Sequence, residues 1–195
     1  MRAREQIGVV SMLQVQRRPL KLAGSYDPAW LLQVDEAFVG PVGVLGLADG
    51  GWVVDAHHGA HPQCRGRGNR PLTIGFTAGY QRMRARYGDV AVDGIAGENI
   101  IVRSDLVPPA RLLFGGLGVE DTAGRVLELQ RLVPATPCAE FSSFLLGLPE
   151  PASRAAIADD LEYLDGGTRG FVAEMDAAVA PVRLRVGAAV LSAAF

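Results

Sequence analysis

The stretch PVRLRVGAAV, residues 181–190, shows the pattern from which the fold class follows. Its first half places apolar residues on one face and arginines on the other: Val182, Leu184 and Val186 against Arg183 and Arg185. Successive side chains of a β-strand point to opposite faces of a sheet, so this alternation predicts a strand with one buried and one solvated face.

Similar runs of β-branched and aliphatic residues recur between glycines and prolines. They cover residues 7–15, 30–39, 51–56, 89–96, 99–102, 110–115 and 125–133. About eight short strands separated by turn signals favour a mainly β fold, barrel-like with antiparallel or mixed strands, over a parallel α/β sheet. No linker rich in proline, glycine or serine separates two groups of strands, so residues 1–195 are predicted to form a single domain.

Helical periodicity marks several peripheral segments. Apolar residues recur at helix spacing from Phe76 to Tyr87, before Gly88. The same pattern covers residues 141–148, before Pro149, and a third helix is predicted within residues 150–167. In that third segment Ser153 is the expected N-cap and Gly166 the expected end.

The composition excludes several classes of protein. The formal net charge of −2 lacks the basic excess of nucleic-acid-binding proteins. No apolar run reaches about 18 residues, so we expect no membrane partner, and the N-terminal segment lacks the apolar core of a signal peptide. Two cysteines, Cys64 and Cys138, allow at most one disulfide, so we expect a cytoplasmic protein with reduced thiols.

Cys138 lies in the stretch RLVPATPCAEFSSFLLGL, residues 131–148, directly after a proline and before a helical pattern. This places it at or just before a first helical turn, where unpaired N–H groups and the helix dipole favour the thiolate. The alternative is a small buried side chain that fills the core. Glu140, a nearby negative charge, opposes the thiolate.

The loop of residues 53–70 gathers all of the histidines, followed by several arginines. Its titratable residues are Asp55, His57, His58, His61, Cys64, Arg65, Arg67 and Arg70. The spacing of His57 and His61 suits a zinc site on a helix, but Gly59 and Pro62 oppose a helix there. The other interpretation is a polar loop that lines a cleft with an anion-attracting rim. Arginine suits phosphate recognition, although a GC-rich gene also explains its excess over lysine.

The segment DGIAGENIIV, residues 93–102, places glycines around a turn and a Glu-Asn pair before a strand. Taken alone it predicts a hairpin. The sequence holds no phosphate-binding loop of the G-x-x-x-x-G-K-[ST] type. It also holds no Gly-x-Ser-x-Gly elbow, so a hydrolase triad has no support.

Taken in order, these segments resemble the MOSC domain, named for the C-terminal domain of molybdenum cofactor sulfurase. The likeness runs from Asp55-Ala56-His57-His58-Gly59 through Gly97-Glu98-Asn99 and residues 112–129 to Pro137-Cys138 and the closing segment 164–190. No single motif is specific, and the ordered set carries the resemblance across nearly the whole chain.

The resemblance implies a mainly β, MOSC-like barrel with peripheral helices that binds molybdenum cofactor (molybdopterin) or another small anionic ligand. Cys138 would carry sulfur as a persulfide or bind molybdenum as a thiolate. The second role goes with reduction of N-hydroxylated compounds. The implied partner is a sulfur-donor or electron-donor protein. The larger sulfurase has a separate pyridoxal phosphate domain, for which this chain has no room.

The site residues implied by the resemblance are Cys138 as the catalytic residue and metal ligand, and Asp55, His57, Gly59, Gly97, Glu98, Asn99 and Arg131 around the cofactor. If the strand 125–133 keeps its alternation, Arg131 shares the inward face of Leu127 and Leu129, where a cofactor phosphate would pair with it. Val54 and Ala188 depart from the family pattern, which expects glycine and aspartate there. They motivate an alternative: a non-catalytic module that binds a small anionic ligand on the same fold.

Overall fold

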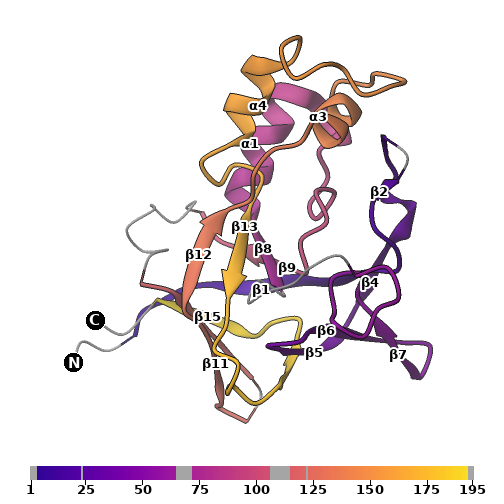
Figure 1. Ribbon diagram of the computed structural model, residues 1–195. Helices are drawn as coiled ribbons and strands as arrows, with labels where there is room; N and C mark the ends of the chain where they lie inside the picture. Colours follow the sequence, from indigo (N-terminus) through magenta and orange to yellow (C-terminus); the bar gives the residue numbers. More distant parts are fainter. Residues whose placement is uncertain (1–3, 23, 65–71, 106–114, 122, 193–195) are drawn as a thin grey trace.

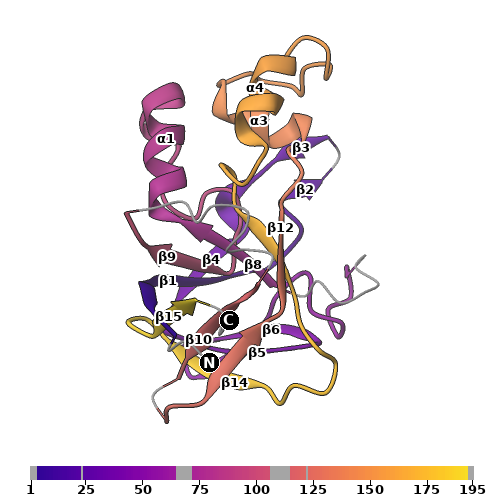
Figure 2. The same ribbon diagram turned by 90° about the vertical axis from the view of Figure 1, so that its left-hand side faces the viewer.

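The computed structural model of the chain describes residues 4–22, 24–64, 72–105, 115–121 and 123–192. Strands dominate these residues, and the helices gather at one end of the molecule, above the sheets (Figures 1 and 2). The predicted mainly β fold with peripheral helices is thereby confirmed. No helix within these ranges is long and apolar enough to cross a membrane.

The larger sheet has nine strands, in the order β11-β10-β15-β1-β9-β8-β13-β12, with β4 also paired to β1. In chain order its strands are β1 (Gln6–Gln16), β4 (Leu31–Val34), β8 (Leu72–Phe76), β9 (Ile100–Arg103), β10 (Leu117–Glu120), β11 (Val126–Leu129), β12 (Arg131–Pro134), β13 (Phe171–Glu174) and β15 (Ala189–Ser192). All of its pairings are antiparallel except that of β8 with β9.

The two ends of this sheet are consecutive in the chain. β11 ends at Leu129, β12 begins at Arg131, and the Gln130 N–H between them binds the carbonyl of Glu174 in β13. The sheet thus curves back toward its own beginning through one bent segment. Among the described strands, β11 and β12 do not pair side by side, so the expected barrel is an open curved sheet that the chain itself joins end to end.

The smaller sheet has the order β14-β5-β6-β7, formed by β14 (Val182–Arg185), β5 (Glu36–Gly40), β6 (Gly43–Ala48) and β7 (Gly51–Val54). The alternation predicted for β14 is confirmed, because Val182 and Leu184 are buried whereas Arg183 and Arg185 are exposed and pair with Glu36. Val186 lies beyond the end of the strand and is exposed. A further hairpin joins β2 (Lys21–Leu22) to β3 (Ser25–Tyr26).

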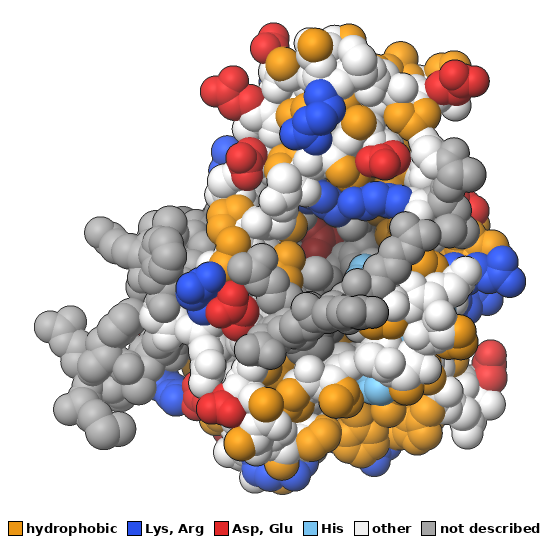
Figure 3. All heavy atoms as spheres, in the orientation of Figure 1, with side chains coloured by type: hydrophobic (Ala, Val, Ile, Leu, Met, Phe, Trp, Pro, Cys, Tyr) orange, Lys and Arg blue, Asp and Glu red, His pale blue; other side chains and the backbone are white. Residues whose placement is uncertain are grey.

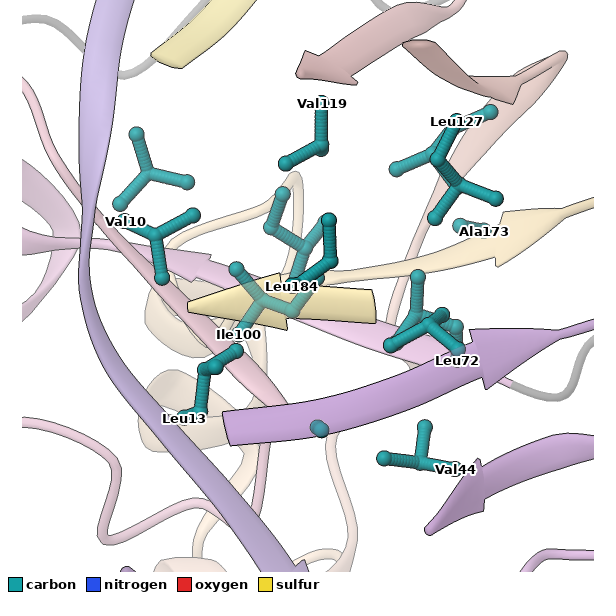
Figure 4. Packing of buried hydrophobic residues seen from close by; sticks show 14 of the residues in the cluster. Val10, Leu13, Val44, Leu72, Ile100, Val119, Leu127, Ala173 and Leu184 are labelled. Carbon is teal, nitrogen blue, oxygen red and sulfur yellow. The ribbon is translucent and has the colours of Figure 1, made fainter. Parts of the chain in front are cut away.

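The main core lies between the two sheets. Leu184 and Val44 of the smaller sheet meet Leu13, Ile100 and Leu127 of the larger one (Figure 4). All five side chains are almost completely buried. Burial of apolar surface is the dominant favourable term in folding, so this shared core holds the two sheets together.

A second core lies between the helices and the sheet. Its helices are α1 (Thr77–Tyr87), α3 (Ala139–Leu145) and α4 (Ala158–Leu164), with 3₁₀ turns η1 (Pro28–Trp30) and η2 (Gly88–Val90). Tyr80, Met83, Phe141 and Leu164 are buried in this core together with Ile101 of β9. Gly88 ends α1 with a φ of 74°, as predicted.

Some sequence-based boundaries are wrong. Residues 89–96 form η2 and turns instead of a strand, and the predicted strand 30–39 breaks at Asp35 into β4 and β5. The third helix begins at Ala158, with Ile157 at the N-cap instead of Ser153. Of the predicted strand 110–115, residues 110–114 lie outside the described residues.

The parallel pair positions the Gly-Glu-Asn turn. The chain leaves β8, forms α1 and returns in β9, whose Ile100 lies opposite Ile74. This crossover brings Glu98 and Asn99, directly before β9, beside Thr73 at the beginning of β8. Residues far apart in the sequence therefore meet at one edge of the sheet, under the helices.

Candidate functional site

A cavity of about 420 Å³ opens where the sheet edge meets the helical end of the molecule. Its charged or titratable lining residues are Lys21, Tyr26, His57, Glu98 and Arg169. Figure 3 shows the hollow, with acidic atoms in its depth and a basic side chain along its upper edge. The cavity thus presents opposite charges within a small volume.

Asp55 stands directly behind the cavity, at the end of β7, and is completely buried. Its Oδ2 accepts hydrogen bonds from the Gln16 N–H at 2.7 Å and from Asn99 Nδ2 at 3.0 Å. Its Oδ1 accepts the His57 N–H at 2.8 Å and lies 3.1 Å from His57 Nδ1. This carboxylate joins β1, the loop after β7 and the turn before β9, so it holds the walls of the cavity together.

Asn99 completes the same network from the other side. Its Oδ1 accepts hydrogen bonds from both the N–H and the Oγ1 of Thr73, each at 3.1 Å. Gly97 before it has a φ of +91°, and a Cβ there would lie 2.8 Å from Nε2 of Gln16, which donates to the Gly97 carbonyl. The positive φ favours glycine here, and a Cβ would in addition displace the ends of the Leu20 and Gln16 side chains.

Glu98 is a buried carboxyl group, with 3% of its surface exposed. Tyr80 of α1 donates a hydrogen bond of 2.5 Å to its Oε2, while Oε1 has no hydrogen-bond partner within the described part of the chain. Burial raises the pKa of Glu98 to about 7, although the Tyr80 hydrogen bond and the Arg169 charge oppose the shift. Glu98 therefore changes its charge near neutral pH.

Arg169 precedes β13 and forms one side of the cavity. Its Nη1 donates to the Thr136 carbonyl at 2.7 Å, and its guanidinium lies 5.3 Å from the centre of the Phe141 ring. Its positive charge opposes the rise in the pKa of Glu98 that burial causes. Together with Lys21 it supplies the cationic side of the cavity.

Cys138 is the N-cap residue of α3, as the sequence predicts, and is half-buried against the second core. The Cys138 side chain forms a hydrogen bond with the Glu140 carboxyl group. The pKa of Glu140 is lowered, mainly by a hydrogen bond from its own backbone N–H and further by the bond with Cys138, although burial opposes the shift. Cys138 does not border the cavity, but Thr136, two residues earlier, does. The thiol thus stands beside the site instead of inside it.

The structure separates the predicted site residues into three groups. His57, Gly97, Glu98 and Asn99 border the cavity together. Asp55 supports them from behind, whereas Gly59 binds the carbonyl of Val42 and does not border it. Arg65, Arg67 and Arg70, predicted as an anion-attracting rim, lie outside the described residues.

The inward position predicted for Arg131 is wrong. Its side chain is 49% exposed and forms an ion pair of 3.2 Å with Glu174, so it does not point inward. The alternation breaks at Gln130: Leu127, Leu129 and then Leu132 are buried, and Arg131 falls on the outer face. Arg169 occupies the position that Arg131 was expected to take beside the cavity.

A zinc site made by the histidines finds no support. His57 and His61 do not share a helix, because the segment between them forms turns. Within the described ranges no group of three histidine, cysteine, aspartate or glutamate residues is arranged to hold a metal ion. A bare metal ion therefore has no ready ligand set in this part of the chain.

Sequence reasoning missed Tyr26, Tyr80 and Arg169. Tyr80 belongs to the apolar helical pattern between Phe76 and Tyr87 and is buried, and its hydroxyl also donates a hydrogen bond to Glu98. Tyr26 packs its ring 5.0 Å from that of Phe141 and donates to the Ile95 carbonyl at 2.6 Å. The only sequence signal for Arg169 was its place in the Gly-Gly-Thr-Arg-Gly segment.

Comparison with known proteins identifies similar folds. The chain is similar to the YuaD protein from Bacillus subtilis, with a TM-score of 0.57 and 14% identity over 100% of both chains. It is also similar to YiiM from Escherichia coli, with a TM-score of 0.51 and 12% identity over 100% of this chain and 71% of YiiM. No protein-family model and no curated protein matches the sequence. The structural likenesses support a MOSC-like fold, and at these identities they establish the fold alone.

Proposed function

We propose that this chain is a stand-alone MOSC-type protein that binds molybdenum cofactor in the cavity and uses Cys138 as its reactive sulfur. The observation that carries the proposal is the lining of the cavity, where Lys21 and Arg169 stand beside the polar side chains of His57, Glu98 and Asn99. An anionic ligand with hydrogen-bonding groups matches this set of side chains.

The residues fit the organic part of the cofactor. Lys21 and Arg169 would hold its phosphate, since arginine and lysine bind phosphate oxygens as charge-assisted donors. Glu98 and His57 would meet the polar edge of its ring. The metal would arrive already held by the pterin, which agrees with the lack of a three-residue ligand cluster among the described residues. When bound, the cofactor supplies two-electron redox chemistry at molybdenum.

Two reactions at Cys138 satisfy the proposal. In sulfur relay, a protein persulfide R–S–SH reacts with the Cys138 thiol; its S–S bond breaks, a new bond forms to Sγ, and the donor leaves as R–SH. In reduction, Cys138 would be the protein ligand of molybdenum, and an N-hydroxylated compound R–NH–OH would take up two electrons and two protons, giving R–NH₂ and water. An electron-donor protein supplies the electrons.

Metal and mass analysis of the gently purified protein tests the proposal. We expect molybdenum and pterin, or a mass gain of one sulfur atom, on the wild type and on the matched control Cys64→Ser. Cys138→Ser should lose both. Molybdenum with pterin supports the reductase, and persulfide without molybdenum supports the relay. If Cys138→Ser behaves as the wild type in both measurements, the proposal is wrong.

A non-catalytic anion-binding module is the second candidate. The position of Cys138 favours it, because the thiol contacts Glu140 and does not border the cavity. The rate of alkylation of Cys138 against pH, measured in the Cys64→Ser background, separates the two candidates. A midpoint near that of a free thiol, about 8.5, with no cofactor copurifying favours the module.

A further inference from the structure

The histidines of the loop after β7 differ in what their ring nitrogens contact. The chain has 3 histidines, and all of them lie in this loop. Nδ1 of His58 accepts the Ala60 N–H at 3.1 Å, and Nδ1 of His61 accepts the Gln63 N–H at 3.1 Å. Because a backbone N–H can only donate, Nδ1 carries no proton in either ring, and the proton of each neutral ring lies on Nε2.

His57 has the opposite arrangement. Its Nδ1 lies 3.1 Å from Oδ1 of Asp55. That carboxylate already accepts hydrogen bonds from the Gln16 N–H, the His57 N–H and Asn99 Nδ2, all of which are obligate donors. A fully buried carboxylate surrounded by donors acts as an acceptor, so His57 Nδ1 carries the proton and donates to Asp55. The lone pair of the neutral ring is then on Nε2.

The His57 ring is half-exposed at the wall of the cavity. The His57 side chain is 50% exposed while its Asp55 partner is fully buried, and His57 borders the cavity. His58 is buried, and His61 Nε2 lies 3.3 Å from the carbonyl of Arg17, to which it donates. Among the three, His57 alone combines a carboxylate at Nδ1 with a place on the cavity wall.

We propose that His57 is the acid–base residue of the cavity and that Asp55 is its positioning residue. The neutral ring takes up a proton at Nε2, and the Asp55 carboxylate fixes the tautomer and stabilises the imidazolium. In the reductase form of the proposed function, on which this inference rests, Nε2 gives that proton to the hydroxyl oxygen of R–NH–OH as the N–O bond breaks. The oxygen leaves as water, the nitrogen takes its proton from solvent, and the electron donor supplies two electrons.

The first experiment needs neither cofactor nor substrate. Long-range ¹H–¹⁵N correlation spectra of the labelled full-length protein at alkaline pH separate the Nδ1–H from the Nε2–H tautomer for each ring. We expect Nδ1–H at His57 and Nε2–H at His58 and His61. In Asp55→Asn we expect the preference at His57 to be lost while the other two rings keep theirs. An Nε2–H tautomer at His57 in the wild type overturns the proposal.

The second experiment measures turnover of the cofactor-loaded protein, with benzamidoxime as the N-hydroxylated probe and reduced viologen as the electron donor. His57→Gln should lower kcat about 100-fold or more, while the matched control His61→Gln should stay close to the wild type. Lys21, Tyr26, Glu98 and Arg169 also border the cavity, and Cys64 contacts the His57 carbonyl. Glu98→Gln therefore serves to separate the Glu98 titration, which burial moves to about pH 7, from the acid–base role of His57: it should keep the alkaline limb of the pH profile that His57→Gln loses.

The two experiments distinguish the failures. An inactive wild type with the Nδ1–H tautomer at His57 refutes the reductase but supports the pairing of His57 with Asp55. An active wild type whose kcat and pH profile survive His57→Gln overturns the acid–base role and leaves the proposed function intact.

Discussion

The hydroxyl of Tyr80, on helix α1, donates a hydrogen bond of 2.5 Å to Oε2 of Glu98 and accepts one of 3.2 Å from the Ala96 N–H. This contact joins the helical layer to the turn that borders the cavity. Glu98 is buried, and its carboxyl group accepts a side-chain hydrogen bond from Tyr80. A buried carboxyl group held in this way makes the stability of the fold depend on pH.

Glu98→Gln should remove that dependence. The pKa of Glu98 is raised from 4.5 to about 7 on folding, so between these values the folded chain holds more protons at this group than the unfolded chain. The contribution of Glu98 to the free energy of unfolding therefore falls as pH rises from 4.5 through 7 and is constant at higher pH. Urea denaturation from pH 4 to pH 8 should show that the free energy of unfolding of Glu98→Gln, relative to that of the wild type, increases with pH by up to about 3 kcal/mol. An equal difference at every pH would contradict the assignment.

Tyr80→Phe should destabilise the fold by about 1–3 kcal/mol, because it leaves Oε2 of Glu98 and the Ala96 N–H without this partner. The loss should be larger at pH 8 than at pH 5, since a hydrogen bond to a charged carboxylate is the stronger one. The matched control is Tyr163→Phe, whose hydroxyl donates at the surface to the Arg82 carbonyl. Equal losses in the two variants, measured by urea denaturation, would count against a special role of the buried pair.

Gly170→Ala tests the packing around Glu98. Gly170 has a φ of +112°, and a Cβ there would lie 2.7 Å from Oε1 of Glu98 and 2.9 Å from the Ile74 carbonyl. Gly166 has a φ of +63° and free space around its Cβ position. Gly166→Ala should cost about 1–2 kcal/mol of backbone strain, and Gly170→Ala clearly more. Thermal denaturation measures the difference, and equal melting temperatures of the two variants would contradict this account of the packing around Glu98.

Arg169→Gln and Arg131→Gln should differ sharply in cofactor content. Arg169 borders the cavity, whereas Arg131 forms an exposed ion pair, which contributes about 0–1 kcal/mol to stability. We expect molybdenum per protein to fall in Arg169→Gln and to stay at the wild-type level in Arg131→Gln. Plasma mass spectrometry of both variants checks this, and the reverse result would restore the interpretation made from the sequence.

Strand alternation predicted much of the fold, and it failed where tertiary pairing changed the register. Val182 to Arg185 alternate strictly and form β14 as expected. In residues 125–133 the buried apolar positions change from Leu127 and Leu129 to Leu132, and the Gln130 N–H binds the Glu174 carbonyl where this change occurs. The sequence shows this change of face, but it does not show its cause, because the partner strand β13 begins only at Phe171.

The sequence motifs identified segments that lie together in the structure. The Asp55–His57 and Gly97–Asn99 segments meet at the cavity, and Asn99 donates a hydrogen bond to Asp55. Tyr80 and Arg169 were not predictable as residues of the cavity region. For Tyr80, helix periodicity predicts that the ring is buried but does not predict the partner of its hydroxyl. The place of Arg169 depends on how the segment before β13 packs against Thr136.

Native mass spectrometry of the full-length protein isolated from molybdenum-replete cells tests the central claim most directly. The account predicts an added mass that matches molybdenum with its pterin, present on the wild type and lost together from the double variant Lys21→Gln, Arg169→Gln. A wild-type protein that carries no pterin and no molybdenum, and whose Cys138 carries no extra sulfur, would contradict it.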